Sequence, residues 1–348
     1  MSTPVGFPTR KPANTPAPTD GGLVDGYGRL HTDLRISVTD RCNLRCVYCM
    51  PEGDMAWLPR EEILTFEEIE RVARVAHGLG VTAVRLTGGE PLVRAHLPVL
   101  VGKVAALGFE DLSMTTNGLG LPHLARDLAG AGLRRVNISC DSLRPERFAA
   151  ITRRDALAQV LEAMDAAEAA GLVPLKVNVV LMRGVNDDEV VDFAGFARAT
   201  GRIVRFIEYM PLDADHHWQR PDVVPGEEIL ERVHAVWPLE PVPGNGIDPA
   251  PARRWRFSDG AGEIGVITSV TEAFCGTCNR LRLTADGAIR NCLFAVQEWS
   301  ARDLMRSGDS DDDLARLLRG AVWGKLPGHG INQPDFLRPA RSMSMIGG

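Results

Sequence analysis

Short runs of alternating apolar and polar residues recur along the first two thirds of the chain and predict six strands. They cover residues 34–38, 84–87, 112–115, 136–141, 175–179 and 203–210, although the period of the last is unclear. Helical patterns lie between them. Thr65 with Glu68 is typical of a helix start, and an apolar face follows at Ile69, Val72 and Ala76. This order predicts β-strand–helix units with parallel strands.

Each predicted strand has one apolar face and one polar face. The polar positions are Arg35, Arg85, Asn137, Ser139, Asp141, Lys176 and Asn178. Parallel strands in an open α/β sheet are usually apolar on both faces, because helices cover both sides. A polar inner face instead predicts a partial (β/α)6 barrel of the TIM type whose lumen holds a substrate.

The two ends of the chain differ from the predicted barrel, which we place at residues 26–215. Residues 1–25 are rich in Pro, Thr and Gly and predict a disordered extension. After residue 215 prolines punctuate the chain, with strand-like runs at 263–268 and 279–284 and a helical pattern at 314–323. Residues 216–348 therefore predict an α+β region.

Composition narrows the class of protein. The 348 residues are 45% hydrophobic and 24% charged, which is ordinary for a soluble globular protein. No long apolar stretch predicts a membrane span, and the first residues lack the apolar core of a secretion signal, so we expect a cytoplasmic protein. The net charge of −6 argues against nucleic acid as the main partner.

The seven cysteines fall into two groups of three and a remainder. Cys42, Cys46 and Cys49 form the first triad, and Cys275, Cys278 and Cys292 form the second. An odd number in a reducing compartment favours metal binding or catalysis over disulfides. Cys140 shares the apolar face of its strand and predicts a buried core thiol.

The first triad directly follows the first predicted strand, at the end of a barrel where active sites form. Three thiolates can hold a four-iron cluster and leave one iron open, whereas a structural zinc site needs a fourth ligand. The segment Thr87–Pro91 follows the second strand, and Gly88 and Gly89 there permit close backbone approach.

The second triad allows the same two interpretations, with His329 as a candidate fourth ligand for zinc. Arg280 and Arg282 lie next to it on one face of a strand. Together with Arg35, Arg85 and Lys176 they make five cations around one lumen. Since arginine binds phosphate as a bidentate fork, the set predicts an anionic ligand such as a triphosphate.

The motif C-x3-C-x2-C, with Tyr48 before its last cysteine, and the TGGEP segment resemble the radical S-adenosylmethionine (SAM) superfamily. Further segments narrow the resemblance to the family of GTP 3′,8-cyclases. They are DLRISVTDRCNLRCVYCMP at 33–51, VRLTGGEPL at 84–92, TTNG at 115–118, VNISCDSL at 136–143, LKVNVV at 175–180, RFIEYMP at 205–211, FCGTCNRLRLTADG at 274–287 and the terminal Gly347–Gly348.

This resemblance implies the first step of molybdenum cofactor biosynthesis. A reduced cluster would cleave SAM, and the resulting 5′-deoxyadenosyl radical would take the 3′ hydrogen of GTP. The C3′ radical would attack C8 of guanine and give (8S)-3′,8-cyclo-7,8-dihydroguanosine 5′-triphosphate. The cofactors implied are two [4Fe–4S] clusters and SAM.

The resemblance also implies residue roles. The first triad would hold the SAM cluster, and the second an auxiliary cluster whose open iron meets guanine. SAM would contact Tyr48, Gly89, Ser139 and Met210. GTP would contact Arg35, Arg85, Thr116, Lys176, Arg280, Leu281 and Arg282. Catalytic roles would fall to Arg35, Gly347 and Gly348. Periodicity agrees for Arg35, Arg85, Ser139 and Lys176, does not support Thr116, and does not resolve Met210.

The implied partners are GTP, an external electron donor and the downstream enzyme that forms cyclic pyranopterin monophosphate, with a homodimer expected by analogy. Two alternatives remain. A radical SAM enzyme that modifies peptides could also carry an auxiliary cluster, but would not need the five cations. A zinc-stapled binding protein would have no catalytic activity.

Overall fold

The predicted strands form the centre of one curved sheet. The computed structural model describes residues 15–53, 55–243 and 251–347. Within them the strands are β1 (Asp33–Ser37), β2 (Ala83–Thr87), β3 (Asp111–Thr116), β4 (Arg135–Ser139), β5 (Lys176–Leu181) and β6 (Ile203–Glu208). They pair in sequence order, and every pair is parallel. The predicted partial barrel is confirmed.

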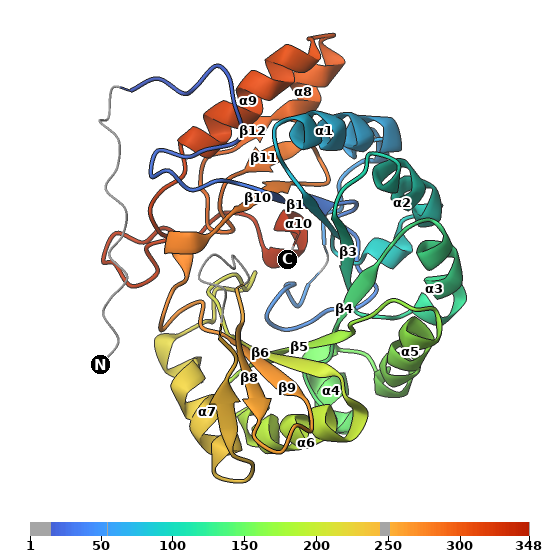
Figure 1. The fold of residues 1–348 in the computed structure, drawn as a ribbon, viewed down its shortest axis with the longest axis vertical. Helices are drawn as coiled ribbons and strands as arrows, with labels where there is room; N and C mark the ends of the chain where they lie inside the picture. The colour runs from blue at the N-terminus through green and yellow to red at the C-terminus, as the bar shows by residue number, and fades with distance from the viewer. Residues whose placement is uncertain (1–14, 54, 244–250, 348) are drawn as a thin grey trace.

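Seven helices of the described residues cover the outer face of this sheet (Figure 1). They are α1 (Phe66–Gly78), α2 (Leu97–Ala105), α3 (Leu121–Gly130), α4 (Pro145–Thr152), α5 (Leu157–Ala169), α6 (Val190–Thr200) and α7 (Gly226–His234). The helix start predicted at Thr65 is confirmed. The Thr65 hydroxyl accepts from the Glu68 N–H at 3.2 Å, and the Glu68 carboxylate accepts from the Thr65 N–H at 2.8 Å.

The last third of the chain extends the same sheet on both sides instead of forming a separate layer. Strand β10 (Arg280–Leu283) pairs parallel with β1, and β9 (Glu263–Ile267) pairs parallel with β6. Antiparallel strands then follow outward: β11 (Ala288–Arg290) and β12 (Trp299–Ser300) beyond β10, and β8 (Arg253–Phe257) and β7 (Leu239–Pro241) beyond β9. The sheet thus carries the second triad beside the first strand of the barrel.

The remaining helical segments are short or lie at the ends of the chain. Helices α8 (Ala301–Arg306) and α9 (Asp311–Trp323) lie beside β11, and α9 includes the predicted segment 314–323. Single 3-10 turns are η1 (Arg60–Glu62), η2 (Pro91–Val93), η3 (Asp187–Glu189), η4 (Arg220–Asp222) and η5 (Cys275–Thr277). Helix α10 (Met343–Ile346) lies near the centre of the curved sheet (Figure 1).

Alternation along each strand sorts side chains between the core and the lumen. Leu34 and Ile36 of β1 and Leu86 of β2 are fully buried against the helices. Cys140 joins the same core, and its Sγ donates to the Ser142 carbonyl at 3.4 Å. The prediction of a packing thiol is therefore confirmed.

The end of the N-terminal segment 1–25 packs against the rest of the protein, although its composition predicts disorder. Residues 1–14 lie outside the described residues. Leu23 and Asp25, however, have no exposed surface, and Val24 forms a bridge with Leu30. The predicted disorder is therefore wrong for the end of the 1–25 segment, because Leu23 reaches the core. In the part of the chain that the structure describes, no helix is long and apolar enough to cross a membrane.

Candidate active site

A cavity of about 280 Å³ opens at the carboxyl ends of the barrel strands. Its wall contains most of the predicted site residues: Arg35, Cys42, Cys46, Tyr48, Cys49, Arg85, Gly89, Thr116, Ser139, Met210, Cys275, Cys278, Arg280, Arg282 and Cys292. All seven cysteines lie within the described residues and are free thiols. The fold therefore brings both triads, which are more than 200 residues apart in sequence, to one space.

The first triad lies in the loop that follows β1. Two hydrogen-bond donors face the Cys42 sulfur: the Leu44 N–H at 3.4 Å and the Asn117 amide at 3.8 Å. Burial raises the pKa of Cys42 to about 11 and that of Cys49 to about 12. Neutral thiols are therefore the resting form here, and a bound metal would have to displace their protons.

The glycine pair after β2 lets a second loop approach this one. A Cβ atom at Gly89 would collide with the carbonyl oxygens of Asp40 and Arg41. The Gly89 N–H instead donates to the Thr39 carbonyl at 2.7 Å, and the Glu90 N–H donates to the Arg41 carbonyl, also at 2.7 Å. Only glycine fits here. The prediction that the glycine pair permits close backbone approach is therefore confirmed at Gly89.

Glu90 explains how Thr116 reaches the cavity. The Thr116 hydroxyl and the Asn117 N–H both donate to the Glu90 carboxylate at 2.6 Å. Burial raises the pKa of Glu90 to about 7. Thr116 is the last residue of β3, where strand alternation stops. The alternation along β3 therefore does not determine the direction of the Thr116 side chain.

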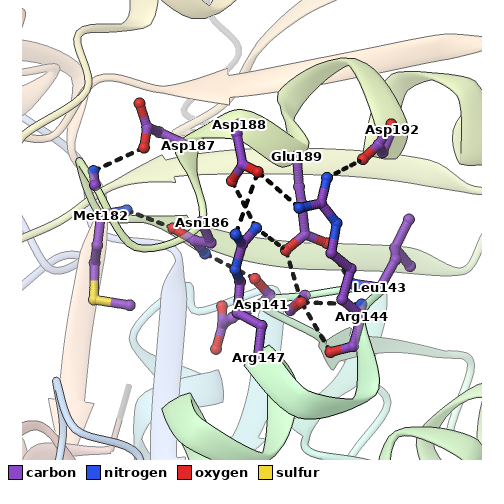
Figure 2. Close-up of polar contacts among 12 residues, drawn as sticks. Asp141, Leu143, Arg144, Arg147, Met182, Asn186, Asp187, Asp188, Glu189 and Asp192 are labelled. Atoms are coloured by element: carbon purple, nitrogen blue, oxygen red, sulfur yellow. Dashed lines mark hydrogen bonds and ion pairs between the residues drawn. The ribbon is translucent and has the colours of Figure 1, made fainter.

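A polar network fixes the end of β4 and the residues after it (Figure 2). The Asn186 amide donates to the Asp141 carbonyl at 2.7 Å, and the Glu189 carboxylate accepts from Ser142 and from the Leu143 N–H, each at 2.7 Å. The Asp141 side chain is thereby held toward the first triad, where it accepts from the Tyr48 hydroxyl at 2.6 Å. Burial raises the pKa of Asp141 to about 6.

The second triad has a cationic environment. Arg280 Nε and Lys325 Nζ each lie 3.4 Å from the Cys278 sulfur. Burial alone would raise the pKa of Cys278, but the charges of Arg280 and Lys325 outweigh it and lower that pKa to about 6. For Cys275, burial outweighs the backbone hydrogen bond from His329 and the charge of Arg280, and it raises the pKa to about 11. Cys278 thus ionises more readily than Cys275.

Each triad fits an iron–sulfur cluster in its donor chemistry. Both sets offer three thiols with N–H groups directed at a sulfur, as is common around cluster ligands. Over residues 15–53, 55–243 and 251–347, no three His, Cys, Asp or Glu side chains are placed to hold one metal ion. His329, the candidate fourth ligand for zinc at the second triad, does line the cavity.

Arginines from neighbouring strands meet at the bottom of the cavity. The register places Arg35 of β1 between Arg85 of β2 and Arg282 of β10. Burial, followed by the charge of Arg85, lowers the pKa of Arg35 to about 9. Among the described residues, no group pairs with the buried Nε of Arg35. Crowded, desolvated cations of this kind favour binding of an anion.

Known proteins resemble this chain along nearly its whole length. Family models match residues 36–197 (Radical SAM superfamily) and residues 202–331 (Molybdenum Cofactor Synthesis C). A protein of Mycobacterium sp. strain KMS named GTP 3′,8-cyclase is 49% identical over 99% of both chains. A GTP 3′,8-cyclase of Streptomyces coelicolor is 49% identical over 94% of this chain and 96% of its own. The chain belongs to the GTP 3′,8-cyclase family.

More distant solved structures share only the fold of this family member. SuiB of Streptococcus suis, bound to its precursor peptide SuiA, superimposes with a TM-score of 0.58 at 14% identity, covering 85% of this chain and 68% of SuiB. The structure of anSMEcpe with bound AdoMet gives 0.56 at 15% identity, with 84% of each chain covered. These likenesses confirm the radical SAM barrel and say nothing about the substrate.

Two of the predicted GTP contacts lie elsewhere in this cyclase family member. Lys176, the first residue of β5, lines a second cavity of about 250 Å³ that shares Arg35, Arg85 and Arg205 with the first. The Leu281 side chain is fully buried in the core. A contact of Leu281 with GTP would therefore have to come from its backbone, because Arg280 and Arg282 take the inner face of β10.

The C-terminal tail reaches the barrel, as the family resemblance implies. Arg282 donates to the Gly347 carbonyl, and a Cβ atom at Gly347 would crowd Thr87 and Ser37. Gly347 also has a φ of +81°, which favours glycine. Gly348, the other predicted tail residue, lies outside the described residues.

Sequence reasoning missed several residues of the cavity wall. Arg205 lines both cavities, but Ile207 shares its face and interrupts the polar pattern of β6. Glu90 also lines the first cavity, and the resemblance implies no role for it. Lys325 lies in a segment without a clear pattern, and only its contact with Cys278 reveals it.

Proposed function

We propose that this enzyme converts GTP to (8S)-3′,8-cyclo-7,8-dihydroguanosine 5′-triphosphate in the first step of molybdenum cofactor biosynthesis. The observation that carries the proposal is that one cavity holds two cysteine triads and a row of buried arginines. A radical-generating group and an anionic nucleotide can therefore meet in a single enclosed space. Family membership supports the same reaction.

The first triad and its surroundings serve SAM. Cys42, Cys46 and Cys49 hold the cluster; when bound, cluster and SAM supply the radical that removes the ribose 3′ hydrogen. Tyr48, Gly89, Ser139 and Met210 line the adjoining wall and orient SAM. Burial raises the pKa of Glu90 and of Asp141 nearby, and the positive charge that SAM carries on its sulfonium and amino groups would favour the ionised form of both carboxyl groups.

The second triad and the arginines serve GTP. Cys275, Cys278 and Cys292 would hold a second [4Fe–4S] cluster, which would supply an iron site for the guanine ring. Arg35, Arg85, Arg280 and Arg282 neutralise the triphosphate as it enters. Thr116 borders the same cavity, and Lys176 lines the adjoining one, whose wall shares Arg35 and Arg85 with the first.

The remaining roles follow the family. Arg35, Gly347 and Gly348 assist catalysis, and the Arg282–Gly347 bond gives the tail a defined place beside the substrate. We assign the barrel to residues 26–215 and the auxiliary-cluster region to 216–348. An external electron donor reduces the enzyme, the product passes to the enzyme that forms cyclic pyranopterin monophosphate, and the chain acts as a cytoplasmic homodimer.

Anaerobic analysis tests this proposal directly. Reconstituted protein should contain about eight irons per chain, as two four-iron clusters require. Incubation with SAM, dithionite and GTP should release 5′-deoxyadenosine and form the cyclised nucleotide. Absence of a GTP-dependent product from protein with both clusters intact would refute the cyclase assignment, and a colourless protein with zinc would favour the binding-protein alternative.

A further inference from the structure

A buried chain of polar side chains joins the N-terminal segment to the second cysteine triad. It runs from Asp25 through His31 to Lys325 and ends at the Cys278 sulfur. Asp25 and His31 have no exposed surface, and Lys325 is 4% exposed. Nothing in the mechanism above uses these residues. Such a costly set of buried polar groups needs a role.

The Lys325 ammonium group has three hydrogen-bond acceptors around it. Its Nζ lies 2.9 Å from the Arg280 carbonyl, 3.4 Å from Cys278 Sγ and 3.5 Å from His31 Nδ1. An ammonium group has three donors and no acceptor, so these three acceptors saturate it. Its position beside the sulfur is therefore fixed from three directions.

Asp25 determines which nitrogen of His31 faces Lys325 as an acceptor. Burial opposes ionisation of Asp25, but hydrogen bonds from His31 and Arg29 lower its pKa to about 2, so it is a carboxylate. A carboxylate only accepts, so His31 Nε2, 3.1 Å away, must carry the proton. Burial, and next the charge of Lys325, lower the pKa of His31 to about 4. The ring is neutral, and Nδ1 presents a lone pair to the ammonium.

Arg29 ties the same segment to the backbone around the triad. Its guanidinium donates to the Cys275 carbonyl at 2.6 Å, to the Leu326 carbonyl at 2.6 Å and to the Pro327 carbonyl at 3.0 Å. Its Nε also donates to Asp25 at 2.5 Å. One buried carboxylate thus orients both the arginine that holds the triad loop and the histidine that holds Lys325.

We propose that Lys325, oriented by Asp25 and His31, is a positioning residue that sets the reduction potential of the second cluster through its hydrogen bond to Cys278. A cationic donor at a ligand sulfur stabilises the more negative, reduced state and raises the potential. The proposal rests on the proposed second cluster, and it gives the segment 23–31 a part in the auxiliary site.

The test is an EPR-monitored redox titration of the full-length protein with both clusters loaded. Lys325→Met should move the midpoint of the second cluster to a more negative potential and leave that of the first cluster in place. Lys103→Met is the matched control, because Lys103 pairs with Glu70 on the surface and should move neither midpoint. Pulsed EPR should also lose one exchangeable proton coupling at the second cluster.

His31→Leu provides an independent measurement if Lys325→Met loses its second cluster. It keeps the lysine and all cysteines but removes the acceptor that holds the ammonium, so the midpoint should shift in the same direction by a smaller amount. An unchanged second midpoint in a variant that retains about eight irons would overturn the proposal. Wild-type protein with only about four irons would instead refute the second cluster itself, which separates the two failures.

Discussion

The two cysteine triads share a cavity but differ in the charge around them. Glu90 and Asp141 lie buried near the first, and all three of its thiols have raised pKa values because of burial. Arg280 and Lys325 contact the second and lower the pKa of Cys278 despite burial. One wall of the cavity thus carries carboxyl groups, and the other carries cations.

This difference in charge indicates how one cavity can bind two ligands, each at its own end. SAM carries positive charge and GTP carries several negative charges, so each is drawn to the wall of opposite sign and repelled by the other. The low dielectric of a buried site strengthens both effects. Charge, in addition to shape, would then fix the relative orientation of the two molecules.

The largest expected effect comes from removing one ligand of each triad. Cys46→Ser should abolish 5′-deoxyadenosine formation, because the first cluster loses one of three thiolates. Cys292→Ser should spare the first cluster and its cleavage of SAM but strongly reduce GTP turnover. Iron content should fall from about eight to about four in both variants. Metal analysis and chromatography of the products measure these outcomes.

Cys140→Ala is the matched control for both variants, since Cys140 is buried in the core and its Sγ donates to the Ser142 carbonyl. Iron content and turnover should stay at wild-type values, with a stability loss of about 1 kcal/mol. GTP turnover that survived Cys292→Ser unchanged would remove the substrate role of the second triad.

A smaller effect is expected at the basic wall. Arg35→Met should weaken GTP binding roughly 10- to 100-fold, because a charge-assisted hydrogen bond contributes about 1.5–3 kcal/mol. SAM binding should change little. Equilibrium binding of each ligand separates the two, and Arg94→Met, which removes a half-buried arginine bonded to the Leu64 carbonyl, is the control. Equal loss of both ligands would contradict the division of the cavity.

The smallest effect concerns pH. Burial, followed by the charges of Arg205, Arg135 and Arg85, lowers the pKa of Lys176 to about 7, and Asp111 opposes this shift. Above that pH the amine is neutral and no longer attracts phosphate, so GTP affinity should fall by up to roughly tenfold between about pH 6 and pH 9.

Lys176→Arg should flatten this pH profile, because arginine stays charged throughout the range. Comparing the two proteins removes the contribution of GTP's own ionisation. If GTP affinity changed with pH equally in wild type and variant, the charge of Lys176 would not contribute to GTP binding. The second cavity would then lie outside the binding site.

Local periodicity was enough to predict the barrel, because each strand and its facing helix depend on residues close in sequence. It also placed Arg35, Arg85 and Ser139 on the inner face. Alternation gives the face of a side chain but not its height along the barrel axis. Lys176 shows the consequence, since it has the predicted parity yet lies at the opposite end of its strand from the triads.

Contacts between distant segments were beyond such reasoning. Nothing local predicts that β10 pairs with β1, and this pairing brings Arg282 beside Arg35. The buried chain through His31 likewise depends on residues almost 300 positions apart. The burial of the Leu281 side chain, in contrast, could have been predicted from sequence, because Leu281 alternates with two arginines that face inward.

The order of strands also affects the tendency of this sheet to aggregate through its edges. A six-stranded parallel sheet would leave β1 and β6 with open rows of backbone N–H and C=O groups, which can recruit strands from other molecules. Here β10 and β9 cover those rows, and the sheet ends in β12 with two residues and β7 with three, one of them proline. Such short terminal strands offer little template for aggregation while the enzyme awaits its clusters.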